Sequence, residues 1–381
     1  MPVYLDHAAT TPLRPEALEA MLPYLRDHYG NPSGSHTLAR RARLAIDEAR
    51  DSVAEALGCR ASEVVFTGGG TEADNQAIAG VLAVRGGVAV CSAVEHHAVL
   101  HAVERAGGRI VGVDDRGTID LDRLAAELDA LARSGTPVGV VAVMLANNEV
   151  GTVQPLEAVA ATVARHTPGA VVHTDAVHAT PWIDVARAAQ AAALVSVSAH
   201  KFGGPKGVGV LVVRDGTTVA PVLVGGGQEH ERRSGTHNVA GIVGLAEALR
   251  RTVAERPATV ARVAAQRDRL VAGLRASVPG LVETVPAEAK TAGNAHVLID
   301  GIENEALLYL LDRAGICASG GSACASGAME PSHVLAAMGV PRAAAFGAVR
   351  FTLGVTTTDA DVDAALAAVP SAVAQLRRGA P

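Results

Sequence analysis

Residues 194–213 read Leu194-Val-Ser-Val-Ser-Ala-His-Lys-Phe-Gly-Gly-Pro-Lys-Gly-Val-Gly-Val-Leu-Val-Val213 and contain two apolar, β-branched runs. Runs of this kind predict strands, here Leu194–Ser198 and Val208–Val213. The link between them, from Lys201 to Gly207, is too short for the crossover connection that joins parallel strands. We therefore expect the second strand to run antiparallel to a neighbour.

Upstream, the chain alternates short apolar runs with helix-length amphipathic segments. The apolar runs predict strands at Val64–Thr67, Val88–Ser92, Arg109–Val113, Val138–Leu145 and Ala170–Thr174. The segments between them include Glu72–Val84, Leu121–Ala132 and Leu156–Arg165. This alternation indicates a largely parallel sheet covered by helices on both faces. With the antiparallel strand included, the sequence predicts an α/β fold built on a seven-stranded mixed sheet.

The composition and residue pattern of the sequence change after about Gly241. An Ala- and Arg-rich stretch predicts a long helix in two parts, Ile242–Glu255 and, beyond Pro257, Thr259–Ser277. Strand and helix patterns follow it. We predict a large domain over residues 15–250 and a smaller α/β domain formed by residues 1–14 and 251–381.

Composition excludes several classes of function. The 381 residues are 49% hydrophobic, which is enough for a large core. A net charge of -6 and only 2% aromatic residues argue against nucleic-acid binding. The N-terminus does not resemble a signal peptide, and no charge-free apolar run reaches the roughly 18 residues of a membrane span. We expect a soluble cytoplasmic enzyme.

Neither the cysteines nor one pair of histidines indicates a metal site. His97 and His101 stand four residues apart, as two ligands on a helix would, but no HExxH or CxxC motif accompanies them. Surface or interface histidines are the favoured interpretation, and we predict no metal site. Four cysteines are too few and too scattered for a disulfide framework: Cys59, Cys91, Cys317 and Cys324.

A glycine-rich turn, Gly68-Gly-Gly-Thr-Glu72, follows one predicted strand and opens a helix. Free N–H groups and the helix dipole at such a start favour a phosphate group. The motif is neither GxGxxG nor a Walker A loop, so an ordinary turn remains an equal alternative.

Two strand ends carry an acid and a lysine. Asp175 ends Val171-Val-His-Thr-Asp175, and Lys201 follows the next strand. Active sites of open α/β sheets gather at such ends. A desolvated lysine can form a Schiff base, unlike arginine, and an acid can keep a pyridine nitrogen protonated, as pyridoxal 5'-phosphate requires. A buried Asp–Lys ion pair is the alternative.

Ordered motifs along nearly the whole chain resemble the cysteine desulfurases of the bacterial iron–sulfur-cluster type, within the class V aminotransferase-like family. The resemblance implies the type I fold of pyridoxal-phosphate-dependent aminotransferases, with a large and a small domain, working as a homodimer. The matching stretches are Tyr4-Leu-Asp-His-Ala-Ala-Thr-Thr-Pro12, Gly30-Asn-Pro-Ser33, Phe66-Thr-Gly-Gly-Gly-Thr-Glu72, Glu95-His96, Asn147-Asn-Glu-Val-Gly151, Ser198-Ala-His-Lys201, Gly203-Gly-Pro-Lys-Gly207, Arg233-Ser-Gly-Thr236, Gly321-Ser-Ala-Cys324 and Val349-Arg-Phe351.

The same resemblance assigns the cofactor contacts. Lys201 is expected to bond covalently to the cofactor, and Asp175 to pair with its pyridine nitrogen. Thr236 is expected to reach the phosphate bound by the other subunit. The phosphate contacts within one chain are expected from Gly70, Thr71, Ser198 and His200.

Catalytic and substrate contacts are implied in the same way. His96 should stack on the cofactor ring and move protons, and Asn148 should lie near the ring and the substrate. Arg350 should hold the substrate carboxylate, a bidentate task that suits a planar guanidinium. Lys206 follows a Gly-Gly-Pro turn, which favours a structural role.

Cys324 distinguishes a desulfurase from an aminotransferase. It lies in the small-residue run Ser319–Ala328, which suits a mobile loop rather than a core. The reaction needs a thiolate that attacks the substrate sulfur and then carries a persulfide to an acceptor, so the residue must be exposed and able to move. The spacing to Glu330-Pro-Ser-His333 resembles the long-loop branch of the family, and the other cysteines are expected to be inert.

One position departs from the family pattern, because Asp-Ala-x-Gln reads Asp175-Ala-Val-His178 here. His178 is expected to replace the glutamine that contacts the cofactor's phenolic oxygen, or to turn away and leave a water in that place. A histidine can donate as a neutral tautomer or as a cation.

The resemblance implies L-cysteine as the substrate and a sulfur-acceptor protein as a partner. The acceptor itself is open: a cluster scaffold, a tRNA thiolation enzyme or another biosynthetic pathway. A selenocysteine lyase or another class V lyase is the alternative enzyme, and a non-catalytic assembly partner is the alternative of a different class.

Overall fold

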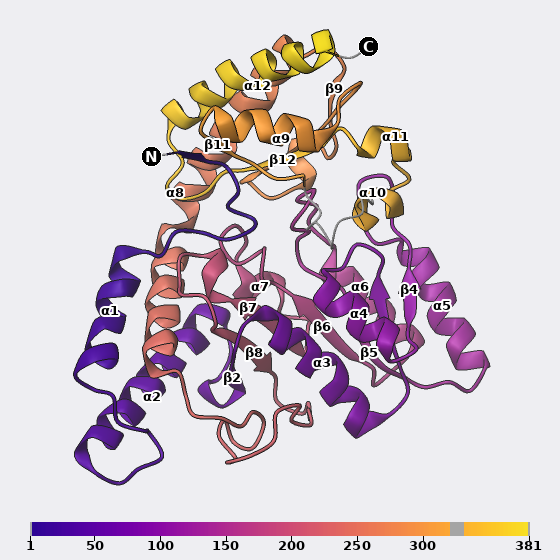
Figure 1. Ribbon diagram of the computed structural model, residues 1–381. Helices are drawn as coiled ribbons and strands as arrows, with labels where there is room; N and C mark the ends of the chain where they lie inside the picture. Colours follow the sequence, from indigo (N-terminus) through magenta and orange to yellow (C-terminus); the bar gives the residue numbers. More distant parts are fainter. Residues whose placement is uncertain (1, 321–330, 380–381) are drawn as a thin grey trace.

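The protein is described by a computed structural model that covers residues 2–320 and 331–379. Its main layer is a seven-stranded sheet with strand order β2-β8-β7-β6-β5-β3-β4 (Figure 1). Pairs among β4, β3, β5, β6 and β7 are parallel, whereas β8 runs antiparallel to both β7 and β2. The strands are β2 Val64–Thr67, β3 Val88–Ser92, β4 Arg109–Val111, β5 Val138–Ala142, β6 Val171–Asp175, β7 Leu194–Ser198 and β8 Gly209–Val213. The predicted mixed sheet is confirmed.

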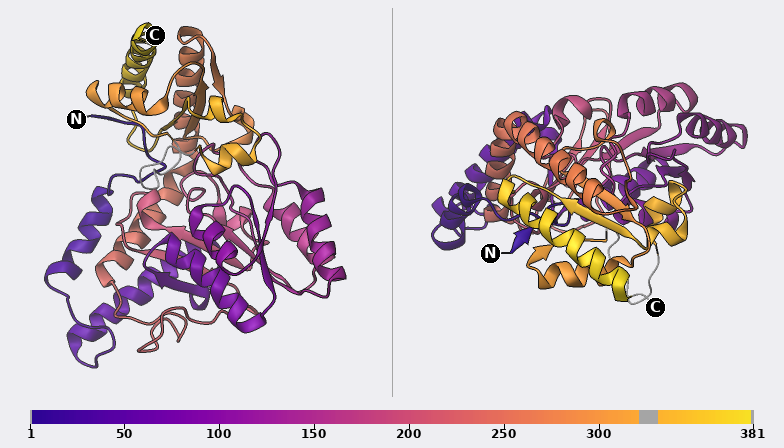
Figure 2. Two further views of the ribbon diagram at one scale, coloured as in Figure 1. Left: turned by 45° about the vertical axis from the view of Figure 1, so that its right-hand side comes forward. Right: turned by 90° about the horizontal axis from the view of Figure 1, so that it is seen from above.

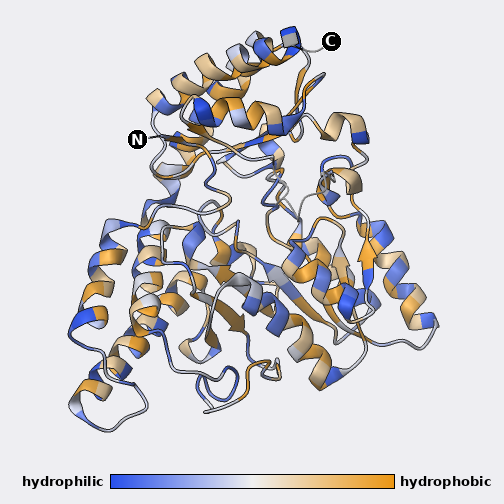
Figure 3. Cartoon of the chain, in the orientation of Figure 1, coloured by the Kyte–Doolittle hydropathy of each residue, from blue (hydrophilic) through white to orange (hydrophobic). Residues whose placement is uncertain are grey.

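The strands are buried because helices cover both faces of the sheet. The helices on the first face are α3 (Gly70–Arg85) and α4 (His97–Arg105). Those on the other are α2 (Thr37–Leu57), α5 (Leu121–Arg133), α6 (Leu156–His166) and α7 (Val185–Ala188), with the first half of α8 (Val239–Ser277). Figure 3 shows apolar residues gathered on the central strands. The continuous apolar runs of the sequence reflect burial from two sides.

Two strands end earlier than predicted: β4 ends at Val111 instead of Val113, and β5 is three residues shorter. We predict Val138–Leu145, but β5 ends at Ala142. The chain nevertheless stays beside β6, because the N–H groups of Val143 and Leu145 donate to the carbonyls of His173 and Asp175, at 3.0 and 2.9 Å. This continued pairing brings residues after β5 alongside the carboxyl end of β6.

The predicted interruption at Pro257 is wrong, because α8 runs unbroken from Val239 to Ser277. A proline inside a helix removes one hydrogen bond and costs about 3 kcal/mol. Packing on both sides offsets this cost. The first half packs against α1 (Pro15–Arg26) and α2, and the second half buries Val263, Leu270 and Leu274 in a second core.

The second core lies among the C-terminal elements and includes Leu5 of the N-terminal segment. Figure 2 shows the N-terminus beside these elements. A three-stranded antiparallel sheet has the order β12-β10-β9, and β1 pairs in parallel with β11. These elements are β1 Val3–Tyr4, β9 Leu281–Glu283, β10 Asn294–Ile299, α9 Asn304–Arg313, β11 Ile316–Cys317, α10 His333–Ala337, α11 Arg342–Ala345, β12 Ala348–Thr352 and α12 Asp359–Gly379. The separate core supports our proposed division into residues 15–250 and residues 1–14 with 251–381.

Among the described residues, no helix has both the length and the apolar character that crossing a membrane requires.

Candidate active site

Lys201 lies just beyond β7, in the short 3-10 helix Ala199–Lys201. Its Nζ donates to the carbonyl oxygens of Ala8, in a short contact, and of Ala9, at 3.0 Å. Desolvation by burial, followed by the positive charge of Arg350, lowers its pKa to about 8. The amine therefore loses its proton more readily than an ordinary lysine, as a nucleophilic lysine must.

Asp175 ends the neighbouring strand β6, and 5% of its surface is exposed. Its carboxylate accepts a hydrogen bond from the N–H of Val177 at 2.8 Å. Burial, and then the nearby Asp74, raises its pKa to about 7, while the charge of Lys201 acts in the opposite direction. The predicted acid and lysine thus meet at the same edge of the sheet.

His96 caps the start of α4, where its Nδ1 accepts from the N–H of Ala98 at 3.1 Å. One side-chain donor atom each of Asp74, His96 and Asp175 lies within 4.8 Å of the other two. Desolvation, and then Lys201, lowers the pKa of His96 to about 4. Solvent reaches part of the ring, so water reduces this shift, but the direction favours a neutral imidazole.

The glycine turn packs so closely against its neighbours that Gly70 has no room for a side chain. Helix α3 begins at Gly70, and its N-cap Gly69 has a φ of 143°, a value that favours glycine. A Cβ on Gly70 would lie 2.8 Å from Val177 and 3.5 Å from the Cβ of Ser198. Gly70, in the first turn of this 16-residue helix, therefore lies close to Ser198 at the end of β7. That arrangement suits a phosphate.

The remaining predicted phosphate residues differ in burial. Ser198 is buried, and Thr71 and Thr236 are exposed. The Nδ1 of His200 lies 3.1 Å from the Oγ1 of Thr10, which ties the N-terminal segment to the end of β7.

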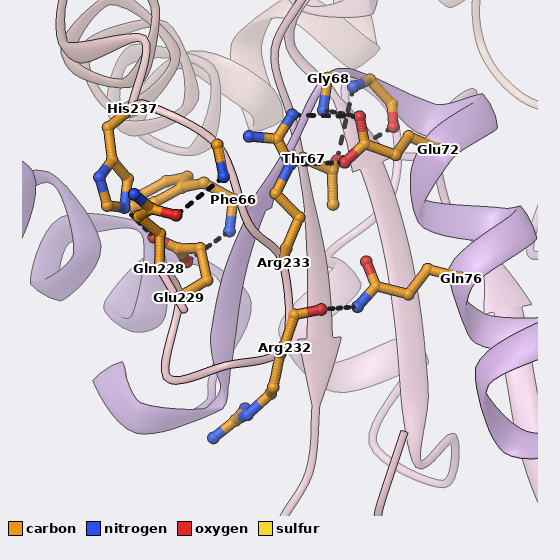
Figure 4. A network of polar contacts seen from close by, with 12 residues as sticks. Phe66, Thr67, Gly68, Glu72, Gln76, Gln228, Glu229, Arg232, Arg233 and His237 are labelled. Atoms are coloured by element: carbon orange, nitrogen blue, oxygen red, sulfur yellow. Dashed lines mark hydrogen bonds and ion pairs between the residues drawn. The ribbon is translucent and has the colours of Figure 1, made fainter. Parts of the chain in front are cut away.

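The segment that carries Thr236 is anchored to the start of α3, as Figure 4 shows. The guanidinium of Arg233 donates to Glu72 at 2.8 and 3.3 Å. The same carboxylate accepts from the N–H of Gly68 at 2.8 Å. Glu72 therefore links the glycine turn to the Arg233–Thr236 motif. Two of the stretches that match the family in sequence are thus in contact in the structure.

A second anchor in Figure 4 is Glu229, which has a φ of 51° and begins a run of three left-handed residues. It accepts from Arg50 at 2.7 and 2.9 Å, from the N–H of Phe66 at 2.8 Å, and lies 2.7 Å from the Nε2 of His237. Burial alone would raise its pKa, but hydrogen bonds from His237 and Arg50 outweigh it and lower the pKa to about 2. These bonds hold a backbone turn that costs energy for residues with a Cβ.

Arg350, on β12, has 4% of its surface exposed. It donates to the carboxylate of Asp6 at 2.8 Å and to the carbonyl of Asn148 at 3.0 Å, while its Nε has no partner among the described residues. The two residues expected near the substrate are thus in contact. The interaction with Asp6 was not predicted, although Asp6 belongs to one of the matching motifs.

His178 lies close to Lys201, with 6% of its surface exposed and no hydrogen-bond partner for Nε2 among the described residues. Burial, and then the charges of Lys201 and Arg350, lowers its pKa to about 3. Of the two forms considered from the sequence, this burial favours the neutral tautomer. Both His178 and Lys201 border the same pocket.

The cysteines cannot all be placed. Cys324 lies outside the described residues. Cys91 is fully buried, and desolvation raises its pKa; burial also raises the pKa of Cys59 to about 11. Cys317 lies on β11, partly buried. The structure agrees with packing roles for Cys59 and Cys91.

His97 and His101 stack with ring centroids 4.8 Å apart on α4. His333, at the start of α10, places its ring centroid 4.5 Å from that of His97 and its Nε2 3.0 Å from the carbonyl oxygen of Glu95. These rings join α4 to α10. The structure therefore gives the predicted surface pair a packing role.

Three buried polar residues near Asp175 were missed from the sequence: Asp74, Glu95 and His173. Asp74 follows Gly70 by one helical turn, and His173 stands two residues before Asp175 on the same face of β6. A polar residue on the apolar face of a predicted helix was the signal that could have revealed Asp74.

Together, the fold and the site define an α/β protein in which a lysine with a lowered pKa faces buried acids at the carboxyl edge of a mixed sheet. The chain belongs to the aminotransferase class-V family, whose model matches residues 3–365.

Similar proteins cover the whole chain. It is 40% identical to the cysteine desulfurase IscS of Dictyoglomus turgidum, over 100% of this chain and 96% of that protein. It is 44% identical to the IscS-like cysteine desulfurase of Mycobacterium tuberculosis, over 99% and 98%. A solved NifS-like protein superposes with a TM-score of 0.90 at 35% identity, covering 99% of this chain and 100% of that one. The NifS-like protein of Rickettsia africae gives 0.88 at 28%, covering 98% and 99%.

Proposed function

We propose that the protein is a pyridoxal-phosphate-dependent cysteine desulfurase that converts L-cysteine to L-alanine and takes the sulfur as a persulfide on Cys324. The observation that carries this proposal is the convergence of Lys201, Asp175 and His96 at the carboxyl edge of the sheet, in a chain that matches cysteine desulfurases along its full length.

The residues of the site fit pyridoxal 5'-phosphate. The start of α3 at Gly70, close to Ser198, suits its phosphate, and Lys201 suits its aldehyde. When bound, the cofactor supplies an electron sink for cleavage of bonds in the substrate. Asp175 would hold a proton at the ring nitrogen, because a buried carboxylate beside a cationic nitrogen is the favourable pairing.

The other side chains would position the substrate and move protons. His96 has a ring nitrogen that can accept a proton and return it, because desolvation and then Lys201 hold the imidazole towards its neutral form. Arg350 would bind the substrate carboxylate, with Asp6 and Asn148 holding the guanidinium in place. Its buried Nε has no partner in the part of the chain that the structure describes, which leaves this arginine with donor capacity to spare.

Sulfur transfer follows from the thiol of Cys324. Its thiolate attacks the substrate sulfur, the carbon–sulfur bond breaks, and alanine leaves while the enzyme keeps a Cys–S–SH group. An acceptor protein then takes the outer sulfur. We propose iron–sulfur cluster assembly, tRNA thiolation or another sulfur-using pathway as the destination.

We also propose a homodimer in which Thr236 reaches the partner's phosphate site. The exposure of Thr236 and the two anchors that fix its segment support this proposal. Exposed apolar residues just before it, Val222, Leu223 and Val224, are 48, 43 and 80% accessible and would be covered by a second subunit.

Incubation with L-cysteine and a reductant tests the function when sulfide and alanine are measured together. Equal amounts of the two products are expected. Faster turnover of selenocysteine would favour the selenocysteine lyase, and a colourless protein that gives neither product would favour a non-catalytic partner.

A further inference from the structure

Asp74 breaks the pattern of the helix that carries it. On α3 it lies on the buried face with Ala73, Ala77, Ile78 and Val81, and only 1% of its surface is exposed. An apolar residue would pack there without a desolvation penalty, whereas a buried carboxylate is costly unless it is neutral or paired. Its position is therefore the first sign of a role beyond packing.

The surroundings of Asp74 do not provide a positive partner. Its Oδ1 has no hydrogen-bond partner among the described residues and lies 3.4 Å from the Nε2 of His173. Burial lowers the pKa of His173 to about 4, so this contact is not an ion pair at neutral pH. Ser196, whose Oγ lies 3.0 Å from the same Nε2, is the one group that favours a charged Asp74.

Asp175 is the better placed of the two acids to carry a charge. It accepts a backbone N–H, and it lies within the electrostatic reach of Lys201. The oxygens of the two acids lie within 4.8 Å of each other. Two buried carboxylates at such a distance do not both ionise readily, so one keeps a proton.

The other titratable groups that face Asp74 and Asp175 do not change which of the two acids carries the charge. Glu95 is buried, and burial raises its pKa, so it adds no positive charge. His96 is held towards the neutral form by desolvation and then by Lys201. Burial raises the pKa of both acids to about 7, so the order rests on the backbone N–H and the charge of Lys201 at Asp175.

We propose that Asp74 is a positioning residue that keeps its proton so that the neighbouring Asp175 can carry the negative charge needed at the cofactor's ring nitrogen. The inference rests on the proposed function, because that function gives the shared proton its purpose. The proton itself is a property of the protein without cofactor. Asp74 can donate that proton to Ser196 or His173, both of which have acceptor capacity.

Infrared spectroscopy of the protein freed of cofactor tests the shared proton directly. With aspartate carboxyls labelled by ¹³C, Glu95 does not contribute. A protonated-carboxyl band is expected near neutral pH in the wild type and is expected to vanish in Asp74→Asn. In Asp175→Asn the band should titrate about 1–2 pH units lower, because the like charge is gone.

Cofactor affinity provides the matched functional readout. Asp74→Asn, with the same shape and no charge, should bind pyridoxal phosphate within about threefold of wild type, whereas Asp175→Asn should bind far more weakly. A loss in Asp74→Asn as large as that in Asp175→Asn would mean that Asp74 acts as an anion, and the proposal would be wrong.

The two proposals fail in different ways. A wild-type band that is absent at neutral pH, or one that persists in Asp74→Asn, overturns the shared proton even if cysteine is turned over. A protein that shows the band but binds no pyridoxal phosphate overturns the proposed function alone. If Asp74→Asn does not fold, the titration of the wild-type band decides the question.

Discussion

His178→Gln gives the sharpest prediction about stability, because burial holds this histidine neutral in the folded chain. Its folded pKa is about 3, against 6.5 in the unfolded chain. Between these values the unfolded chain binds a proton that the folded chain does not, so wild-type stability falls as the pH is lowered from 6.5 towards 3. Above pH 6.5 the effect disappears.

The size of the effect follows from the same two values. Each pH unit below 6.5 costs the wild type about 1.4 kcal/mol of unfolding free energy, so at pH 5 the cost is about 2 kcal/mol. Glutamine does not titrate. Any constant cost of leaving a buried nitrogen unpaired is the same at both pH values and cancels when variant and wild type are compared across pH.

Urea unfolding at pH 8 and pH 5 provides the assay. The single tryptophan, Trp182, borders the same pocket as His178 and reports on unfolding. The difference in unfolding free energy between His178→Gln and wild type should grow by about 2 kcal/mol between pH 8 and pH 5, in favour of the variant. Parallel pH profiles would show that His178 is accessible and titrates normally, which contradicts its burial.

Three further predictions address the catalytic roles and the assembly. Lys201→Ala should abolish turnover and remove most of the cofactor's visible absorbance, while Lys206→Ala should retain both; the reverse result would move the role to Lys206. Cys324→Ser should bind cysteine without releasing sulfide, and mass spectrometry of the wild type should locate the extra sulfur on Cys324 rather than on another cysteine. Sedimentation at assay concentration should show a dimer, and a stable active monomer would contradict the role given to Thr236.

The large sheet could be predicted closely because its strands are buried on both sides. Continuous β-branched runs mark β2, β3 and β7 at the bounds seen in the structure. The short link from Lys201 to Gly207 also predicted the antiparallel β8 correctly. Pro257 misled the prediction because local propensity says nothing about the two cores that hold both halves of α8.

Within the site, sequence motifs identified the residues whose chemical role follows from their own type and their position in the chain. Lys201 and Asp175 stand at strand ends, where parallel strands deliver side chains to one edge. The contacts of Arg350 with Asp6 and of Glu229 with Arg50 join residues more than 170 positions apart, so no local pattern reveals them. Asp74 interrupts the apolar face of its helix, which is a local signal, but its proximity to Asp175 could not be predicted because β6 and β7 build its environment.

The charge of the site differs from the sum of its residues. Taken separately, Lys201 would be positive and Asp74, Glu95 and Asp175 negative. Burial shifts each of them towards its neutral form, because it lowers the pKa of the lysine and raises those of the acids. A site prepared in this way adds few charges of its own, so a bound phosphate would be met mainly by helix N–H groups and a ring nitrogen by one carboxylate. Asp74 and Asp175, whose side-chain oxygens lie within 4.8 Å of each other, are therefore the pair at which a single substitution should change the charge of the site most.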